Sequence, residues 1–146
     1  MGYRVVLTRY SDQEVTGSLI DTEELQARVN VGYKNNASVF ISVHINASTY
    51  SFANGVITFY NKDIDYPLAN YIHNELVKTN IFEDKGIRQA NFYVIKYNRL
   101  PAVLLELGFI TNYNDALKLM SYENLNKLAI AIAKGIHNYI KTNKKS

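Results

Sequence analysis

Two short runs of the sequence are apolar at almost every position, and they constrain the fold more than any other feature. They cover residues 39–45 and residues 102–107. A strand with one face in water alternates apolar and polar side chains, whereas a strand covered on both faces is apolar throughout. The sequence therefore predicts two fully buried strands. Further strands are expected at residues 3–8, 56–60 and 92–96.

Amphipathic helices are expected between and after these strands. Leu68, Ile72 and Leu76 recur at four-residue steps and predict a helix over residues 67–78. A last helix is expected after Ser121, which can cap it. Its apolar stripe consists of Leu125, Leu128, Ala129, Ile132, Ile136 and Tyr139.

An earlier helix is predicted over residues 21–35, where Asp21 and Glu24 have the spacing of a capping box. Strands that alternate with amphipathic helices are typical of an α/β fold with a mostly parallel or mixed central sheet flanked by helices. We therefore expect one α/β domain over residues 1–146. In such sheets functional residues gather beyond the carboxyl ends of the strands.

Composition excludes several classes of protein. With 146 residues, 47% of them apolar and 20% charged, the chain is neither disordered nor fibrous. No apolar run approaches the roughly 20 residues that span a bilayer. The chain has no cysteine, so a metal would have to be held by aspartate, glutamate or one of three histidines.

The chain carries a formal charge of +3, to which lysines near the C-terminus contribute most. This excess alone does not select a partner, and no basic and aromatic motif of a nucleic-acid binder accompanies it. The first residues do not form a signal peptide, because Arg4 interrupts them and no sufficiently long apolar stretch follows. We therefore expect no nucleic-acid partner, and the chain does not itself encode export.

Two of the expected strands carry side chains that could perform chemistry. His44 stands near the end of one apolar run, followed at two residues by Asn46, and Glu106 is the single carboxylate in the other. Burying an unpaired carboxylate is costly and raises its pKa, which suits a general acid or base. A packed, hydrogen-bonded histidine and a glutamate paired with Arg88 or Lys96 are the structural alternatives.

Together these residues suggest a metal-assisted hydrolase, in which a histidine holds zinc and a glutamate moves a proton. A catalytic zinc usually has three protein ligands. His73 and His137 lie in expected helices without a paired metal-ligand spacing and are interpreted as surface or helix-packing residues. Spacing alone thus supports only part of a metal site.

Several ordered segments resemble zinc-dependent N-acetylmuramoyl-L-alanine amidases of the amidase-3 type. The resemblance runs over almost the whole chain and is carried by the segments GYRVVLTR, LQAR, SVFISVHINAS, GVITFYN and KGIRQANFYVIKYNRLPAVLLELGFITNYNDALKL. Members of this family are cell-wall hydrolases, including endolysins and autolysins, that cut the amide bond between N-acetylmuramic acid and L-alanine of peptidoglycan. The resemblance implies an α/β fold, a zinc cofactor, peptidoglycan as substrate and action at the cell wall, including delivery by a phage.

Carried over by position, the resemblance makes His44 a zinc ligand and Glu106 the catalytic glutamate. Asn46, Gln89 and Asn91 are expected to contact substrate in the same cleft. The chain departs from the common family pattern in having Ser38 where Asp is usual, Tyr33 where Asn is usual and Ile57 where Glu is frequent.

The family also has a strand with a glycine-rich histidine motif and a helix with a glutamate ahead of the segment that resembles residues 2–9. These supply the other two zinc ligands, and we expect the chain to lack both. A missing interior strand would expose a sheet edge that another chain could fill. Two hypotheses follow: an amidase whose missing ligands come from elsewhere, or an incomplete amidase that binds the wall or self-associates as a homo-oligomer.

Overall fold

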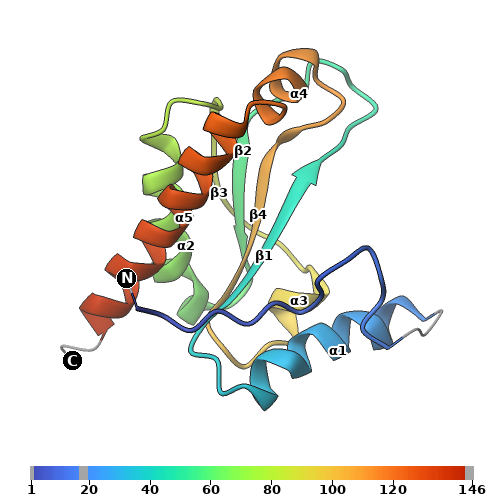
Figure 1. Ribbon diagram of the computed structural model, residues 1–146, viewed down its shortest axis with the longest axis vertical. Helices are drawn as coiled ribbons and strands as arrows, with labels where there is room; N and C mark the ends of the chain where they lie inside the picture. The colour runs from blue at the N-terminus through green and yellow to red at the C-terminus, as the bar shows by residue number, and fades with distance from the viewer. Residues whose placement is uncertain (1, 17–19, 144–146) are drawn as a thin grey trace.

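The computed structural model describes residues 2–16 and 20–143, which form a sheet flanked by helices (Figure 1). Within these ranges no helix combines the length and apolar character needed to cross a bilayer. In chain order the elements are α1 (Asp21–Lys34), β1 (Phe40–Asn46), β2 (Val56–Tyr60), a 3-10 helix (Asp63–Asp65), α2 (Tyr66–Val77), β3 (Asp84–Gln89), α3 (Tyr93–Lys96), β4 (Ala102–Phe109), α4 (Tyr113–Leu119) and α5 (Tyr122–Asn143).

The sheet is mixed, with the strand order β1-β4-β2-β3. β1 runs parallel to β4, β2 runs parallel to β3, and β2 and β4 pair in opposite directions. The most apolar strand, β4, therefore lies inside the sheet with a partner on each side, as its sequence predicts. β1 and β3 form the two edges of the described sheet.

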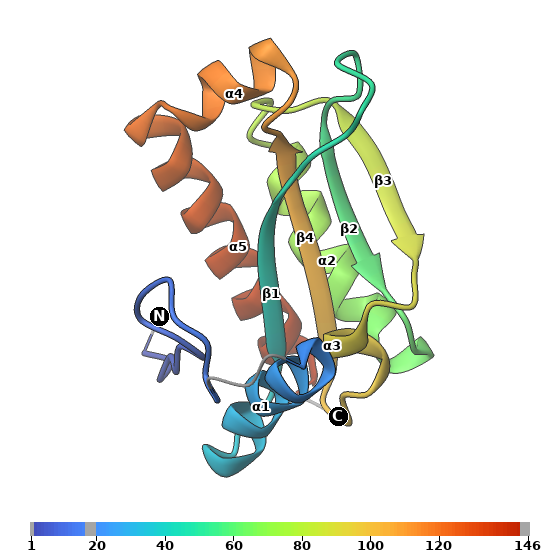
Figure 2. The same cartoon turned by 90° about the vertical axis from the view of Figure 1, so that its right-hand side faces the viewer.

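One face of the sheet is closed by α2 and α5, which lie side by side against it (Figure 2). Their apolar stripes meet Val103, Leu105 and Leu107 of β4 in the larger of two cores. The two helices approach closely at Gly135, where a Cβ atom would lie 2.5 Å from the Cα of Ile72. This face, which we call the closed face, is buried along most of the length of β4.

The opposite face is covered only at one end. α1 and α3 lie near the points where β1 and β4 begin, and they bury a smaller core around Val29, Ile95 and Leu104 (Figure 2). Beyond α1 and α3, toward the carboxyl ends of β1 and β4, the sheet has no helix over it in the described part of the chain. We call this the open face.

Two buried aspartates hold the ends of β4. Asp65 accepts a hydrogen bond from the backbone N–H of Ala102 at 2.9 Å, at the start of the strand. Asp115 accepts one from the N–H of Phe109 at 3.1 Å, at its end. Both carboxylates accept hydrogen bonds from backbone N–H groups at the ends of the strand, and β4 is therefore fixed at both termini.

Most expected elements are confirmed within one or two residues. The α/β class, the mixed sheet and the strands at residues 39–45, 56–60 and 102–107 correspond to observed elements, as do the three long helices. Ser121 caps α5 by accepting a hydrogen bond from the N–H of Asn124 at 3.3 Å. The strand β3 and the helix α4 were not expected, because the sequence of β3 is polar and that of α4 is short.

The strand expected at residues 3–8 is wrong. These residues form no strand, and Val5 is 77% exposed. They are held by side chains instead: the Tyr3 hydroxyl lies 3.0 Å from Nδ1 of His137, and Arg4 donates to the side chain of Asn35 at 3.0 Å. The segment has strand-forming composition but pairs with no strand of the described sheet, and composition alone does not make a ladder.

Two further expectations are wrong. Of the strand expected at residues 92–96, residues 93–96 form the helical turn α3, in which Val94 and Ile95 are buried. A short apolar run fits either a strand or a buried helix. Asp21 and Glu24 make no capping box: the residue before α1 is Ile20, and no side chain caps the helix. The carboxylate of Glu24 instead accepts hydrogen bonds from backbone N–H groups of the loop that precedes α1.

Candidate active site

The sheet register brings His44 and Glu106 together on the open face. They are direct partners across the parallel pair of β1 and β4. On the other side of β4, Ile57 of β2 is the antiparallel partner of Glu106. Residues in register on neighbouring strands project from the same face. Two strands that are far apart in sequence thus place an imidazole beside a carboxyl group.

Glu106 is a partly buried carboxyl group whose hydrogen-bonding capacity is not fully used in the described part of the chain. Its Oε2 atom is buried and has no hydrogen-bond partner among the described residues. Burial raises the pKa of Glu106 from 4.5 to about 6. A carboxyl group with this pKa gains and loses a proton near neutral pH, as a general acid or base must.

The structural alternative for Glu106, an ion pair with Arg88 or Lys96, is wrong. Arg88 donates to the backbone carbonyl of Lys85 at 3.2 Å, and the ammonium of Lys96 lies over the ring of Tyr97. No ion pair of Glu106 occurs within residues 2–16 and 20–143.

His44 is exposed on the open face and is held by its own strand. Its Nε2 atom lies 2.9 Å from the hydroxyl of Ser42, two residues earlier on the same face. Partial burial of the ring lowers the pKa of His44, and the positive charges of Arg28 and Arg9 lower it further. The neutral imidazole, which is the form that binds metals, is therefore favoured. Ser42 was not singled out from the sequence, although the two-residue period of a strand could have indicated it.

A second network fixes the chain beside the site. Glu24 on α1 is buried and accepts hydrogen bonds from the N–H groups of Val15 and Thr16 at 2.8–3.1 Å, and from Arg28 at 3.0 Å. These bonds, that of Val15 foremost, lower the pKa of Glu24 to about 2. The carboxylate thereby holds both the loop before α1 and the guanidinium of Arg28, whose charge acts on His44.

The three expected substrate contacts lie in two different places. Asn46 is the last residue of β1, two positions after His44 and beyond an irregularity in the register with β4, and its side-chain oxygen accepts a hydrogen bond from the N–H of Ala47. Gln89 and Asn91 lie at the far edge of the sheet, where both contact Asn61. β3, which ends at Gln89, is separated from β4 by β2, so the fold does not bring these two residues next to His44.

The other two histidines are packing residues, as expected. His73 is buried on the closed face between the hydroxyl of Thr58, at 2.9 Å from Nδ1, and the carboxylate of Asp84, at 2.8 Å from Nε2. The hydrogen bond from His73 lowers the pKa of Asp84. His137 contacts Tyr3.

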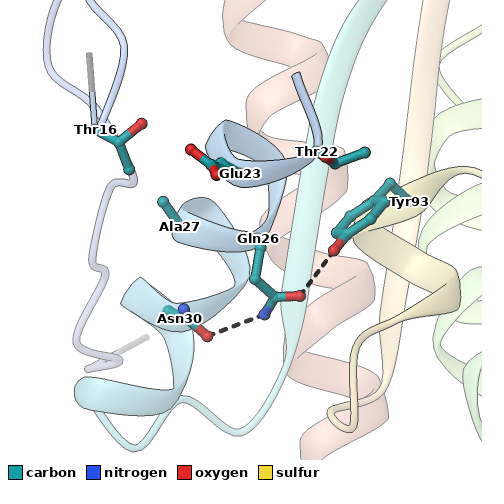
Figure 3. A pocket seen from close by; sticks show the side chains of 7 residues that line it. All are labelled: Thr16, Thr22, Glu23, Gln26, Ala27, Asn30 and Tyr93. Atoms are coloured by element: carbon teal, nitrogen blue, oxygen red, sulfur yellow. Dashed lines mark hydrogen bonds between the residues drawn. The ribbon is translucent and has the colours of Figure 1, made fainter. Parts of the chain in front are cut away.

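A separate hollow of about 390 Å³ lies between α1, α3 and the loop that precedes α1 (Figure 3). Tyr93 donates to the side chain of Gln26 at 3.1 Å, and Gln26 donates to Asn30 at 3.0 Å. Neither His44 nor Glu106 lines this hollow. Its side chains mainly join α1 to α3.

The residues present fit part of a zinc site. His44 offers an accessible imidazole beside an unpaired carboxyl group, which suits one ligand and one proton carrier. Residues 2–16 and 20–143 contain no group of three or more potential ligands that could hold a metal. The described donors therefore do not complete a zinc site by themselves.

An α/β sheet with one open face, on which a histidine adjoins a carboxyl group of raised pKa, has the features of a hydrolase that activates water. Comparison with known families agrees. The family of N-acetylmuramoyl-L-alanine amidases matches residues 1–138, and the chain belongs to this family.

Individual relatives support the assignment. The N-acetylmuramoyl-L-alanine amidase LytC of Bacillus subtilis is 40% identical over 121 residues, covering 79% of this chain and 24% of LytC. The sporulation-specific amidase of the same organism is 31% identical over 148 residues, covering 99% of this chain and 54% of the relative. The chain thus spans about half or less of the length of these curated relatives.

The fold is shared with solved amidase structures. The catalytic domain of CwlV, from Bacillus (Paenibacillus) polymyxa var. colistinus, superposes with a TM-score of 0.82 and 35% identity. The match covers 94% of this chain and 73% of the CwlV chain.

Proposed function

We propose that this chain is the larger part of a peptidoglycan amidase domain, with Glu106 as the catalytic general base and acid and His44 as a zinc ligand. The bond cleaved would be the amide between N-acetylmuramic acid and L-alanine, at the cell wall, whether the protein is exported or delivered by a phage. The observation that carries the proposal is the buried, unpartnered Oε2 of Glu106 beside the imidazole of His44.

The chemistry of the two residues follows from their surroundings. With a pKa of about 6, Glu106 is mostly ionised at neutral pH and can take a proton from an attacking water. The protonated carboxyl group can then give that proton to the departing amine of L-alanine. Zinc, when bound, supplies polarisation of the scissile carbonyl and acidification of water.

The remaining ligands are proposed to come from residues outside this sequence or from another chain. Asn46, which ends β1 two residues after His44, is proposed to contact the substrate. Gln89 and Asn91 are weaker proposals for the same role, because they lie at the other edge of the sheet and bond to Asn61.

The test is an assay for new amino groups of L-alanine released from purified peptidoglycan, with and without added zinc. Zinc-dependent release that Glu106→Gln abolishes would support the proposal. Absence of release in the presence of zinc would show that the chain does not act alone as an amidase.

A second candidate function is supported by the free edge of the sheet. β1 is an edge strand, and Val43 and Ile45 on it are about half exposed. An exposed apolar edge strand is a template for another strand. An incomplete amidase could therefore self-associate, or be completed by a missing segment, while binding the wall.

Sedimentation analysis combined with a zinc measurement separates the two candidates. Self-association predicts a dimer or larger species that Val43→Lys converts to monomer. A monomer that retains one tightly bound zinc per chain would contradict it.

A further inference from the structure

The loop between β1 and β2, residues 47–55, displays two neighbouring aromatic rings to solvent. Tyr50 is 64% exposed and Phe52 is 77% exposed. Their ring centroids lie 5.4 Å apart, with an angle of 37° between the ring planes. Large apolar side chains that lie together in solvent mark a candidate binding surface, because rings left exposed add little to the stability of the fold.

The backbone that carries these rings is fixed to the end of β4 and the start of α4 (Figure 1). The N–H of Ser48 donates to Thr111 at 3.0 Å, the side chain of Asn112 donates to the carbonyl of Ser51 at 2.9 Å, and the N–H of Gly55 donates to the buried Asp115 at 2.8 Å. The rings are therefore held outward by an ordered loop. A preformed site loses little entropy when a ligand binds.

The segment that carries the two rings has no charged side chain of its own. Residues 45–61 contain no lysine, arginine, aspartate or glutamate, and the loop itself offers only hydroxyl, amide, methyl and aromatic groups. Phosphate-bearing polymers are bound through arginine and lysine. A neutral ligand with an apolar face and hydrogen-bonding edges fits better, and the C–H face of an N-acetylated sugar ring has this character.

The loop also continues directly from the candidate site. Asn46 ends β1 two residues after His44, and Tyr50 follows four residues later, at most about 14 Å along the chain. A polymer lying on the open face past His44 would run toward the loop.

We propose that Tyr50 and Phe52 form a platform that stacks against neutral N-acetylated sugar rings of the glycan strand. The choice of ligand rests on the proposed amidase function. The stacking itself does not require catalysis, so the two can be tested separately.

The experiment is calorimetric titration of the full chain with chitotetraose and with glycan strands stripped of their stem peptides. Stripped strands lack the amide bond that an amidase cuts, so an inactive protein can still bind them. The double variant Tyr50→Ala with Phe52→Ala is expected to bind about tenfold more weakly or worse, which corresponds to 1.4 kcal/mol. Tyr50→Phe keeps the ring and is expected to bind within about twofold of the unaltered chain.

Tyr122→Ala is the matched control, because Tyr122 is an aromatic residue that is also exposed, at 85%, but belongs to another element, the start of α5. It is expected to leave sugar binding unchanged. The proposal is overturned if the unaltered chain binds neither sugar ligand, if the double variant binds as well as the unaltered chain, or if Tyr122→Ala causes an equal loss. Preferential binding of polyglycerol phosphate, lost in the same double variant, would also overturn it.

Discussion

The two faces of the sheet each hold a histidine and a carboxyl group, but they treat them differently. On the closed face, His73 bonds directly to Asp84 and Thr58, and the pKa of Asp84 is lowered. On the open face, Glu106 has a buried oxygen that finds no hydrogen-bond partner in the described part of the chain, and burial raises its pKa to about 6. The first arrangement stabilises the fold, whereas the second leaves a carboxyl group that can gain and lose a proton near neutral pH.

Residue type alone therefore does not distinguish a pair that stabilises the fold from a pair proposed to be catalytic. Both pairs contain the same kinds of group, and only the hydrogen bonds made in the fold distinguish them. Changes in the closed-face pair should therefore alter stability, and changes in the open-face pair should alter catalysis.

The largest expected effect is the loss of activity in Glu106→Gln. Removing a general acid and base costs about 10²–10⁴-fold in rate. The variant should fold normally and unfold at no lower urea concentration, since an unpaired carboxyl group is removed. The rate of amino-group release, compared with urea unfolding of the same sample, checks this. Normal activity in the variant would contradict the role of Glu106.

The next effect is on the closed face. His73→Leu leaves the buried hydroxyl of Thr58 without its partner, and we expect a loss of about 2–3 kcal/mol in the free energy of unfolding. Urea denaturation measures it, and activity per folded molecule should be unchanged. The control is the double variant with Thr58→Val, which should be less destabilised than the two single changes added together. Strict additivity would mean that the two side chains are not coupled.

Two glycine substitutions compare how tightly the helices on the two faces are packed. Gly135→Ala places a Cβ atom 2.5 Å from the backbone of Ile72 and should destabilise by about 1–3 kcal/mol. Gly32→Ala in α1 meets only side chains at 3.5 Å or more, and should be neutral or stabilising by up to about 1 kcal/mol. Thermal or urea unfolding of both variants gives the answer, and equal effects would contradict the packing described for α2 and α5.

The two carboxyl groups should also produce opposite dependences of stability on pH. Glu106 has a folded pKa above its unfolded value, so its contribution is most favourable below pH 4.5 and declines as pH rises through about 6. The change amounts to at most about 2 kcal/mol, reduced by solvent screening. Asp84 has a lowered pKa, so its contribution is present above pH 3.8 and is lost as the pH falls further.

Urea midpoints measured from pH 3 to 8 test these directions. Glu106→Gln should remove the decline between pH 4.5 and 6, and Asp84→Asn should weaken the loss at acid pH. If the stability of Glu106→Gln still declines between pH 4.5 and 6, another group causes the decline.

Much of the fold could be predicted because the apolar pattern is strong where the strands are buried. The strands β1, β2 and β4 and the three long helices have clear periodicity. β3 could not be predicted, because an edge strand such as residues 84–89 needs no apolar pattern. The opposite error occurred at residues 3–8, whose side chains favour a strand but which pair with no strand of the described sheet.

The candidate site, like the fold, could be predicted only in part. His44 and Glu106 stand out because each interrupts an apolar strand. The sequence did not indicate that Ser42 holds the imidazole or that Glu24 binds the N–H groups of Val15 and Thr16. Those contacts depend on how the chain folds back on itself. The proposed role of Gln89 and Asn91 rested on sequence proximity to a shared motif, which does not report which edge of the sheet a strand occupies.

The proposed role of Glu106 is tested most directly by titrating the carboxyl groups and following them by carbon-13 NMR. This measurement requires neither a metal nor an active enzyme. The account predicts that Glu106 titrates near pH 6, with the signal absent from Glu106→Gln, while Asp84 titrates below 3.8. A Glu106 that titrates at or below 4.5 would show that its carboxyl group is solvated or paired, and would contradict its assignment as the proton carrier of the open face.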